Sequence, residues 1–244
     1  MAKAADAAGL RELAITDHWD FPGSFDAAGY RAAVLEARAA LGDGGVYLVC
    51  GAELGEATHD PDSALAVVRN NPFDFILGSY HKIKGVEDFF YLRYDTPEKF
   101  HALAERYLDE LLELIGLGCF DVLGHLTYPI RYVSREPALA GVSFKPHQEQ
   151  MRAVLKSLID AGKGLELNVK GLRQKPEPGP TMPELEWLKL YRSLGGEIVT
   201  VGSDAHQIKS VGRGIAEGQA MLREAGFRYV AAYRERNVRF EKLS

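Results

Sequence analysis

The sequence predicts a single α/β domain in which parallel strands alternate with helical crossovers. Short β-type runs alternate with longer runs whose apolar residues recur at helical spacing. Several of the short runs are almost continuously apolar, as strands covered on both faces should be. The 244 residues can bury a sizeable core, and no Ser-rich or acidic linker divides them, so we expect one domain over residues 1–244.

Seven segments are expected to be strands, because each is a short run of residues that favour extended backbone. In chain order they are ELAIT (12–16), YLVCGAE (47–53), FDFILGS (73–79), FDVLGH (120–125), GLELN (164–168), GEIVTVGS (196–203) and YVAAY (229–233).

Helices are expected between these strands, over 26–41, 96–118, 143–162, 181–195 and 211–226. The clearest is 96–118, which opens with a capping Thr, a Pro at the first helical position and then a Glu, and has glycines near its end. The first residues, MAKAADAAGL, also have a helical pattern, although a βα protein normally begins with a strand. We therefore expect an opening strand to be missing. The proline-rich stretch 175–183 is either a rigid connector or part of an active-site rim.

Composition excludes several classes of partner. The formal net charge is -5, so neither nucleic acid nor an anionic membrane is expected to bind. No apolar run approaches the ~20 residues that span a bilayer, and the N-terminus lacks the apolar region of a signal peptide. Cys50 and Cys119 lie in apolar segments without CxxC spacing, which favours reduced core thiols in a cytoplasmic protein.

Polar residues that can bind metals recur where the predicted strands end. They are Asp17, His18, Glu53, His81, His125, Asp204 and His206. A lone His is more often a hydrogen-bonded structural residue than a ligand, and a lone Asp before a helix is usually a cap. Structural hydrogen bonds and caps do not readily explain such residues at the ends of five strands. Because the C-terminal ends of parallel strands gather on one face, we expect these residues to lie together.

Imidazole and carboxylate groups are ligands for Zn, Mn or Fe, and a carboxylate such as that of Glu53 can bridge two ions. Two neighbouring ions can hold a hydroxide and a phosphoryl oxygen together. The pattern therefore favours metal-assisted hydrolysis of a small phosphate ester. Of the remaining histidines, His101 and His147 are expected at the surface, and His59 is a weaker candidate for substrate contact.

The motifs TDHWD, GAELGE, GSYH, DVLGHL, ELNVKGLR and GSDAH occur in the order seen in PHP-domain phosphoesterases. The chain resembles the histidinol-phosphatase branch of this family from about residue 2 to residue 240. The resemblance implies a distorted, TIM-like (β/α)7 barrel with two or three divalent metal ions. It implies that Glu53 bridges two ions, that His81 and His125 complete one site, and that Asp204 serves another with Glu53.

The resemblance further implies that His18 and His206 serve a third metal site. Asp17 would orient a ligand or take part in proton transfer. The family also begins with a strand that carries a His-x-His pair and a further ligand, and these have no counterpart here. We expect a truncated form of a complete enzyme rather than a decayed site, with an open edge in the barrel where the first strand is lacking.

A phosphate dianion requires positive charge around it. Arg173 matches an Arg of the phosphate pocket in this branch, Arg131 could reach the same pocket, and Lys170 is a weaker candidate. Each could instead be a surface residue. The expected reaction is direct hydrolysis of L-histidinol phosphate by a hydroxide that the metal ions generate, and Asp17 or His206 protonates the leaving alkoxide.

Two alternatives stay open at this point. One is a PHP phosphoesterase that acts on nucleotides or nucleic-acid ends, although the acidic net charge disfavours long nucleic acids. The other is a non-catalytic, truncated barrel that binds a metal or a partner chain.

Overall fold

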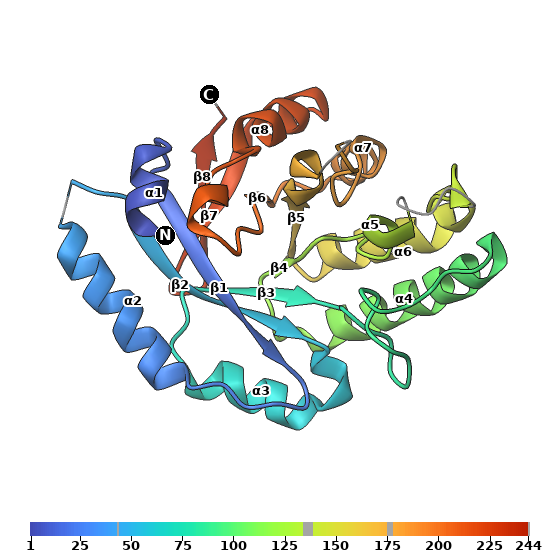
Figure 1. Cartoon of the computed structure of the whole chain (residues 1–244), viewed down its shortest axis with the longest axis horizontal. Helices are drawn as coiled ribbons and strands as arrows, with labels where there is room; N and C mark the ends of the chain where they lie inside the picture. The colour runs from blue at the N-terminus through green and yellow to red at the C-terminus, as the bar shows by residue number, and fades with distance from the viewer. Residues whose placement is uncertain (43, 134–138, 175–177, 244) are drawn as a thin grey trace.

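The chain folds around a curled sheet of six parallel strands, which lies at the centre of Figure 1. The structure is a computed structural model that describes residues 1–42, 44–133, 139–174 and 178–243. Strands that follow one another in the chain are neighbours in the sheet. Their bounds are β1 (Glu12–Asp20), β2 (Tyr47–Gly55), β3 (Phe75–Ser79), β4 (Val122–Leu123), β5 (Gly164–Asn168) and β6 (Val199–Gly202). The predicted α/β class with parallel strands is confirmed.

Helices surround the sheet and cover its outer face (Figure 1). Their bounds are α1 (Ala2–Ala7), α2 (Ala27–Leu41), α3 (Pro61–Asn70), α4 (Pro97–Leu117), α5 (Ile130–Val133), α6 (Gln148–Asp160), α7 (Leu185–Ser193) and α8 (Ile215–Glu224). Helix α4 begins as predicted, because the Thr96 hydroxyl accepts a hydrogen bond from the Lys99 backbone N–H. In the described ranges, no helix combines the length and the apolar character needed to cross a membrane.

Two helices differ from the expectation. Helix α3 was not predicted, although Asp60 caps it and Pro61 occupies its first position, both of which are ordinary start signals. Helix α6 begins at Gln148, after a short 3-10 turn (Lys145–His147), and is therefore shorter than the predicted 143–162. The described part of the proline-rich stretch, 178–183, returns to the end of β5, where Met182 pairs with Asn168; residues 175–177 lie outside the described residues.

The seventh predicted strand does not join the parallel sheet. It forms β7 (Tyr229–Arg234), which pairs in antiparallel fashion with β8 (Asn237–Lys242) in a separate two-stranded sheet. The turn between them places Glu235 and Arg236 at φ of 49° and 65°. Tight hairpin turns of this kind usually carry Gly or Asn at such positions, so the sequence contained little signal for β8.

The hairpin packs beneath the parallel sheet, at the N-terminal ends of its strands, a region that we call the base. Ala231 and Tyr233 of β7 join an apolar cluster with Val49, Phe75, Leu77 and Val122. The Tyr233 and Phe75 rings lie 5.0 Å apart. The opposite end, where the C-terminal ends of β1 to β6 converge, is called the mouth.

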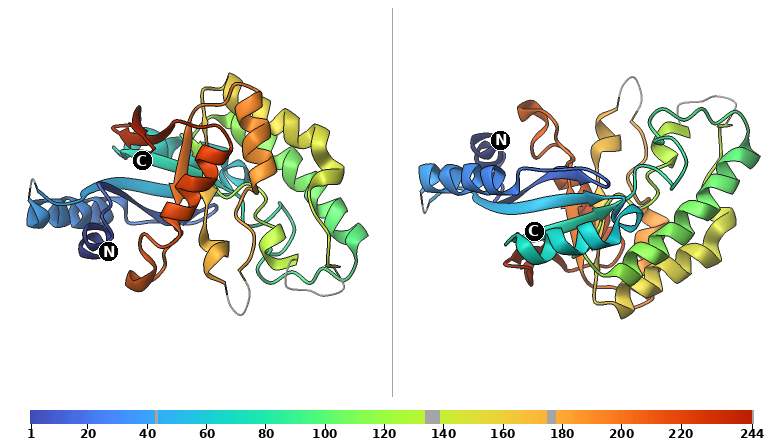
Figure 2. Two further views of the ribbon diagram at one scale, coloured as in Figure 1. Left: turned by 90° about the horizontal axis from the view of Figure 1, so that it is seen from above. Right: turned by 90° about the horizontal axis from the view of Figure 1, so that it is seen from below.

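The curled sheet is not closed. Within the described part of the chain, β1 and β6 are both edge strands, which agrees with the open edge expected from the sequence. A cavity of about 1180 Å³ extends between them, and its lining includes Ala14 and His18 of β1 and Gly202 of β6. Figure 2 shows β1 and β2 extending to one side of the molecule, with α1 and α2 beside them.

Candidate metal centre

Strand register decides which polar residues share the inside of the mouth. Successive side chains of a strand point to opposite faces, and the register places His18 beside Glu53 and Glu53 beside Leu77. Glu53 and His18 therefore lie on the inner face. His81 and His125 lie two residues after the ends of β3 and β4, and their Nε2 atoms reach the Glu53 carboxylate.

Three imidazoles converge on the carboxylate of Glu53. Its Oε1 atom lies 2.9 Å from His125 Nε2 and 3.2 Å from His81 Nε2, and its Oε2 atom lies 3.8 Å from His18 Nε2. Glu53 is only 8% exposed and His125 only 3%. Burial alone would raise the pKa of Glu53, but hydrogen bonds from His125 and His81 outweigh it and hold this pKa well below its usual range.

The group formed by Glu53, His81 and His125 fits a divalent cation. Its three ligand atoms all lie within 4.8 Å of one another. Ligands about 2.0–2.2 Å from a tetrahedral ion are roughly 3.4 Å apart, close to the 2.9 Å and 3.2 Å separations observed here. Two imidazoles and a carboxylate are also ligands that Zn, Mn and Fe accept.

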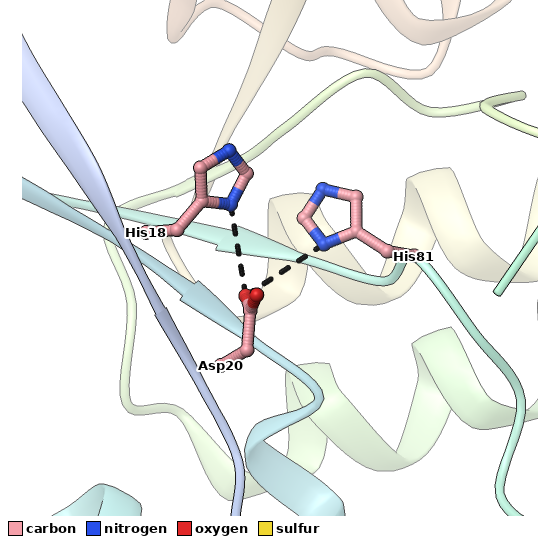
Figure 3. Close-up of side chains that lie close together, drawn as sticks. All are labelled: His18, Asp20 and His81. Carbon is pink, nitrogen blue, oxygen red and sulfur yellow. Dashed lines mark ion pairs between the residues drawn. The ribbon is translucent and has the colours of Figure 1, made fainter. Parts of the chain in front are cut away.

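A second group, which sequence reasoning missed in part, consists of His18, Asp20 and His81 (Figure 3). Asp20 Oδ1 lies 3.6 Å from His18 Nδ1 and 3.8 Å from His81 Nδ1. The pKa of His18 rises to about 9, chiefly through its interaction with Asp20 and against the effect of burial. The predicted strand ended at residue 16, whereas β1 continues to Asp20. The alternation that brings residues 18 and 20 to one face could therefore not be recognised.

Asp17 lies on the outer face of β1, because it alternates with His18. That face borders Tyr30 of α2, whose hydroxyl donates a hydrogen bond to the Ile15 carbonyl (2.6 Å). The structure therefore does not bring Asp17 into the group around Glu53.

Asp204 forms a separate group with three cationic or ionisable side chains. Its Oδ2 accepts from Arg131 Nη2 (3.0 Å), and its Oδ1 lies 3.1 Å from both Lys170 Nζ and His206 Nδ1. Burial would raise the pKa of Asp204, but the His206 hydrogen bond and the charges of Lys170 and Arg131 lower it below its usual value. The side chain of His206 is 61% exposed, and the hydrogen bond that its ring donates to Asp204 raises its pKa.

We expected Asp204 and His206 to be metal ligands. Within the described residues, neither belongs to a group of three side chains placed to bind a metal ion. The rings of His206 and His18 lie 6.2 Å apart, so their shared site stays a prediction. Arg173 belongs to the same neighbourhood, since its Nη2 donates to the Asp204 carbonyl (3.5 Å). Arg131 is buried and lies over the Tyr128 ring, 5.1 Å from its centroid.

Two buried carboxylates were missed. Glu166 accepts a hydrogen bond from the His125 backbone N–H (2.8 Å), and Glu56 accepts one from the His81 backbone N–H (2.6 Å). Burial raises the pKa of Glu166 to about 8. A Cβ at Gly202 would lie 1.8 Å from Glu166 Oε1, so only glycine leaves room for this carboxylate. The available signal was a charged residue inside an apolar strand, GLELN.

The remaining histidines lie outside this centre. His59 faces Glu110 (3.5 Å). His101 and His147 contact each other between α4 and the start of α6, 3.1 Å apart, and are only partly exposed.

Comparison with known proteins gives consistent matches. Residues 1–170 match the PHP domain family. A probable histidinol-phosphatase of Thermotoga maritima is 34% identical over 160 residues, which cover 65% of this chain and 59% of that protein. The match thus spans less than two thirds of that relative. A histidinol-phosphatase of Lactococcus lactis is 28% identical over 240 residues, with 94% and 85% covered.

Two solved structures share the fold. One is the histidinol phosphate phosphatase of Lactococcus lactis, complexed with zinc, L-histidinol and phosphate. Its TM-score is 0.80 at 23% identity, and the match covers 97% of this chain and 90% of that one. The other is a putative histidinol phosphatase of Listeria monocytogenes, with a TM-score of 0.75 at 18% identity and coverage of 88% and 91%.

Proposed function

The chain belongs to the PHP domain family, and from that premise we propose that it hydrolyses L-histidinol phosphate to L-histidinol and phosphate with the help of divalent metal ions. The observation that carries the proposal is the convergence of three imidazoles on the buried Glu53 carboxylate at the mouth. Relatives named histidinol-phosphatase support the choice of substrate, as does the similar structure that binds zinc, L-histidinol and phosphate.

Glu53, His81 and His125 would hold one ion, because their ligand atoms already face a common point. His18 would provide a ligand on the Oε2 side of Glu53. Asp204, which lies beside Lys170, would bind a further ion. We propose two or three ions of Zn, Mn or Fe. When bound, such ions polarise phosphoryl oxygens and lower the pKa of water toward neutrality.

Arg131, Lys170 and Arg173 would bind the phosphate group. Arg131 and Lys170 donate to different oxygens of Asp204, and Arg173 donates to its carbonyl. Arg131 and Lys170 thus already face a carboxylate, and a phosphate dianion can accept hydrogen bonds from all three groups. A guanidinium can hold two phosphate oxygens at once, which an ammonium group cannot.

Protonation of the leaving alkoxide is assigned to His206 rather than Asp17. His206 is exposed at the mouth, whereas Asp17 lies on the outer face of β1. The contact with Asp204 engages Nδ1 of His206 and favours the protonated ring. Its Nε2 is then the nitrogen from which a proton can reach the substrate.

We further propose that residues 1–244 act as one cytoplasmic domain on a small molecule rather than on nucleic acid. A single large apolar cluster that extends from Ala5 to Leu243 supports one domain. The thiols of Cys50 and Cys119 are free and buried, which supports a reducing compartment. The net charge of -5 supports a small substrate.

Phosphate release from metal-stripped protein reloaded with Zn, Mn or Fe tests the proposal. We expect hydrolysis of L-histidinol phosphate only after reloading, with kcat/KM well above that for a panel of nucleotides. Preferential hydrolysis of a nucleotide, or full activity in the stripped protein, would contradict it. The Glu53→Gln variant separates metal-centred activity from a contaminating phosphatase, because a contaminant would be unaffected.

A further inference from the structure

The Asp20 carboxylate faces the imidazole rings of both His18 and His81, as Figure 3 shows. The same oxygen, Oδ1, is 3.6 Å from His18 Nδ1 and 3.8 Å from His81 Nδ1. The two imidazole rings are 5.0 Å apart. Oδ1 of Asp20 thus faces the Nδ1 atom of both imidazole rings.

The other nitrogen of each ring faces Glu53. Nε2 lies 3.8 Å from Oε2 of Glu53 in His18 and 3.2 Å from Oε1 in His81. Both rings therefore present Nε2 to the candidate metal site and Nδ1 to Asp20. A neutral imidazole that binds a metal through Nε2 carries its proton on Nδ1 and needs an acceptor there.

His125 provides an internal contrast. It also directs Nε2 at Glu53, at 2.9 Å. Its Nδ1 is buried and has no hydrogen-bond partner in the part of the chain that the structure describes. A carboxylate oxygen near Nδ1 is thus a feature of His18 and His81, and within the described residues His125 does not share it.

The neighbouring strand leaves room for this arrangement. Register places Gly55 of β2 directly beside Asp20 of β1. A Cβ at Gly55 would lie 2.2 Å from Asp20 Oδ1 and 3.3 Å from His81 Nδ1. Any larger residue at position 55 would therefore push the Asp20 carboxylate away from the two rings.

We propose that Asp20 is a positioning residue that holds His18 and His81 as Nδ1–H tautomers, with their Nε2 atoms directed at the metal centre around Glu53. Glu56 supports only His81, because its Oε1 lies 3.6 Å from Nδ1 of that ring and accepts the His81 backbone N–H. Asp20 is the carboxylate that faces Nδ1 of both rings. The inference rests on the proposed metal centre.

The test compares Asp20→Ala, Asp20→Asn and Gly55→Ala with the wild type. Asp26→Asn is the matched control, since it removes the same charge while Asn still caps α2. Zinc affinity is measured by competition with a chromophoric chelator. The imidazole tautomers are measured by long-range ¹⁵N–¹H NMR on the zinc-loaded proteins. These readouts do not depend on phosphatase activity.

We expect Asp20→Ala to weaken zinc binding by roughly 10–100-fold and to change the Nδ1–H signals of His18 and His81 but not those of His125. Asp20→Asn keeps an acceptor oxygen and should lose less. Gly55→Ala should reproduce the change with Asp20 still present, and Asp26→Asn should match the wild type. The isosteric Asn variant keeps the test informative if Gly55→Ala does not fold.

Two results would overturn the inference. In one, the Asp20 variants keep wild-type zinc affinity and imidazole signals. In the other, they lose one whole equivalent of zinc while the remaining zinc binds normally, which would make Asp20 a ligand. Failure of the wild type to hydrolyse L-histidinol phosphate would refute the proposed substrate but would leave these zinc and NMR results standing.

Discussion

The base and the mouth of the curled sheet both bury carboxylates, but they neutralise them differently. At the base, Asp74 pairs with Arg38 and accepts the Cys50 backbone N–H (3.0 Å). Asp121 likewise pairs with Arg236 and accepts the Ile76 backbone N–H (2.8 Å). Each base carboxylate thus has a permanent cation and a backbone donor.

At the mouth, the partners of Glu53 are the imidazoles of His18, His81 and His125. An imidazole is a cation only when it is protonated, and once deprotonated it becomes a metal ligand. The charge of Glu53 can therefore be balanced either by protons or by an added cation. The comparison indicates that the base pairs are suited to stability, whereas the Glu53 group is suited to binding a metal ion.

The largest expected effect belongs to Glu53→Gln. Replacing the Glu53 carboxylate should abolish zinc binding at the Glu53 group. It should lower kcat/KM by more than about 100-fold, which exceeds the usual loss when a residue that only supports a metal ligand is replaced. The metal-free protein should also lose some stability, because the lowered pKa of Glu53 means that its charged carboxylate favours the folded state. Metal content, activity and urea unfolding measured on one preparation check this, and unaltered metal content would break the comparison.

Arg236→Ala addresses the base. Loss of the guanidinium leaves Asp121 buried without its cation, and we expect the free energy of unfolding to fall by about 2–3 kcal/mol, because the pair is partly exposed. Zinc affinity should stay at the wild-type value. Chemical unfolding and zinc titration measure the two quantities, and a loss of zinc affinity without loss of stability would reverse the assigned roles.

Arg131→Lys sharpens the comparison, because the Arg131–Asp204 pair lies at the mouth but resembles the pairs of the base. If Arg131 binds phosphate, the Lys variant should lose about tenfold in kcat/KM, equivalent to one charge-assisted hydrogen bond. Arg38→Lys at the base is the control and should leave kinetics unchanged. Steady-state kinetics decide, and a purely structural Arg131 would show lost stability with unchanged kcat/KM.

The smallest expected effect is the acid sensitivity of Asp74. Burial raises its pKa, but hydrogen bonds from the Cys50 and Glu235 backbones and from Arg38 outweigh this and lower it. Because the pKa is lower in the folded protein, Asp74 stabilises the fold above about pH 4, and this contribution is lost as the pH falls further.

Asp74→Asn should therefore flatten the decline in stability of metal-free protein between about pH 5 and pH 3, by about 1 kcal/mol or less. Asp121→Asn should not, because burial raises the pKa of Asp121 in the folded state. Urea unfolding across this pH range measures both, and equal flattening by the two variants would contradict the assignment.

The parallel fold and much of the mouth could be predicted because apolar runs end in polar residues there. Glu53, His81 and His125 all follow buried strand segments, and a shared mouth follows from parallel strands. Asp20 could not be predicted, because its face depends on how far β1 extends. The placement of Asp17 on the outer face depends on the same strand length.

Glu166 was missed for a different reason. A Glu within an apolar strand gives no indication of which backbone N–H it will accept, and its partner, His125, lies 41 residues away in the chain. The β7–β8 hairpin was missed because its turn uses Glu235 and Arg236 in a left-handed conformation that glycine usually adopts. These features depend on contacts between distant segments, which local patterns do not encode.

Anomalous diffraction from zinc-soaked crystals tests the central claim most directly, because it locates the cation itself. We expect a zinc peak within bonding distance, about 2.0–2.2 Å, of the Glu53 carboxylate and of Nε2 of His81 and His125. Zinc bound only elsewhere, with Glu53 still hydrogen-bonded to the two imidazoles, would contradict the claim.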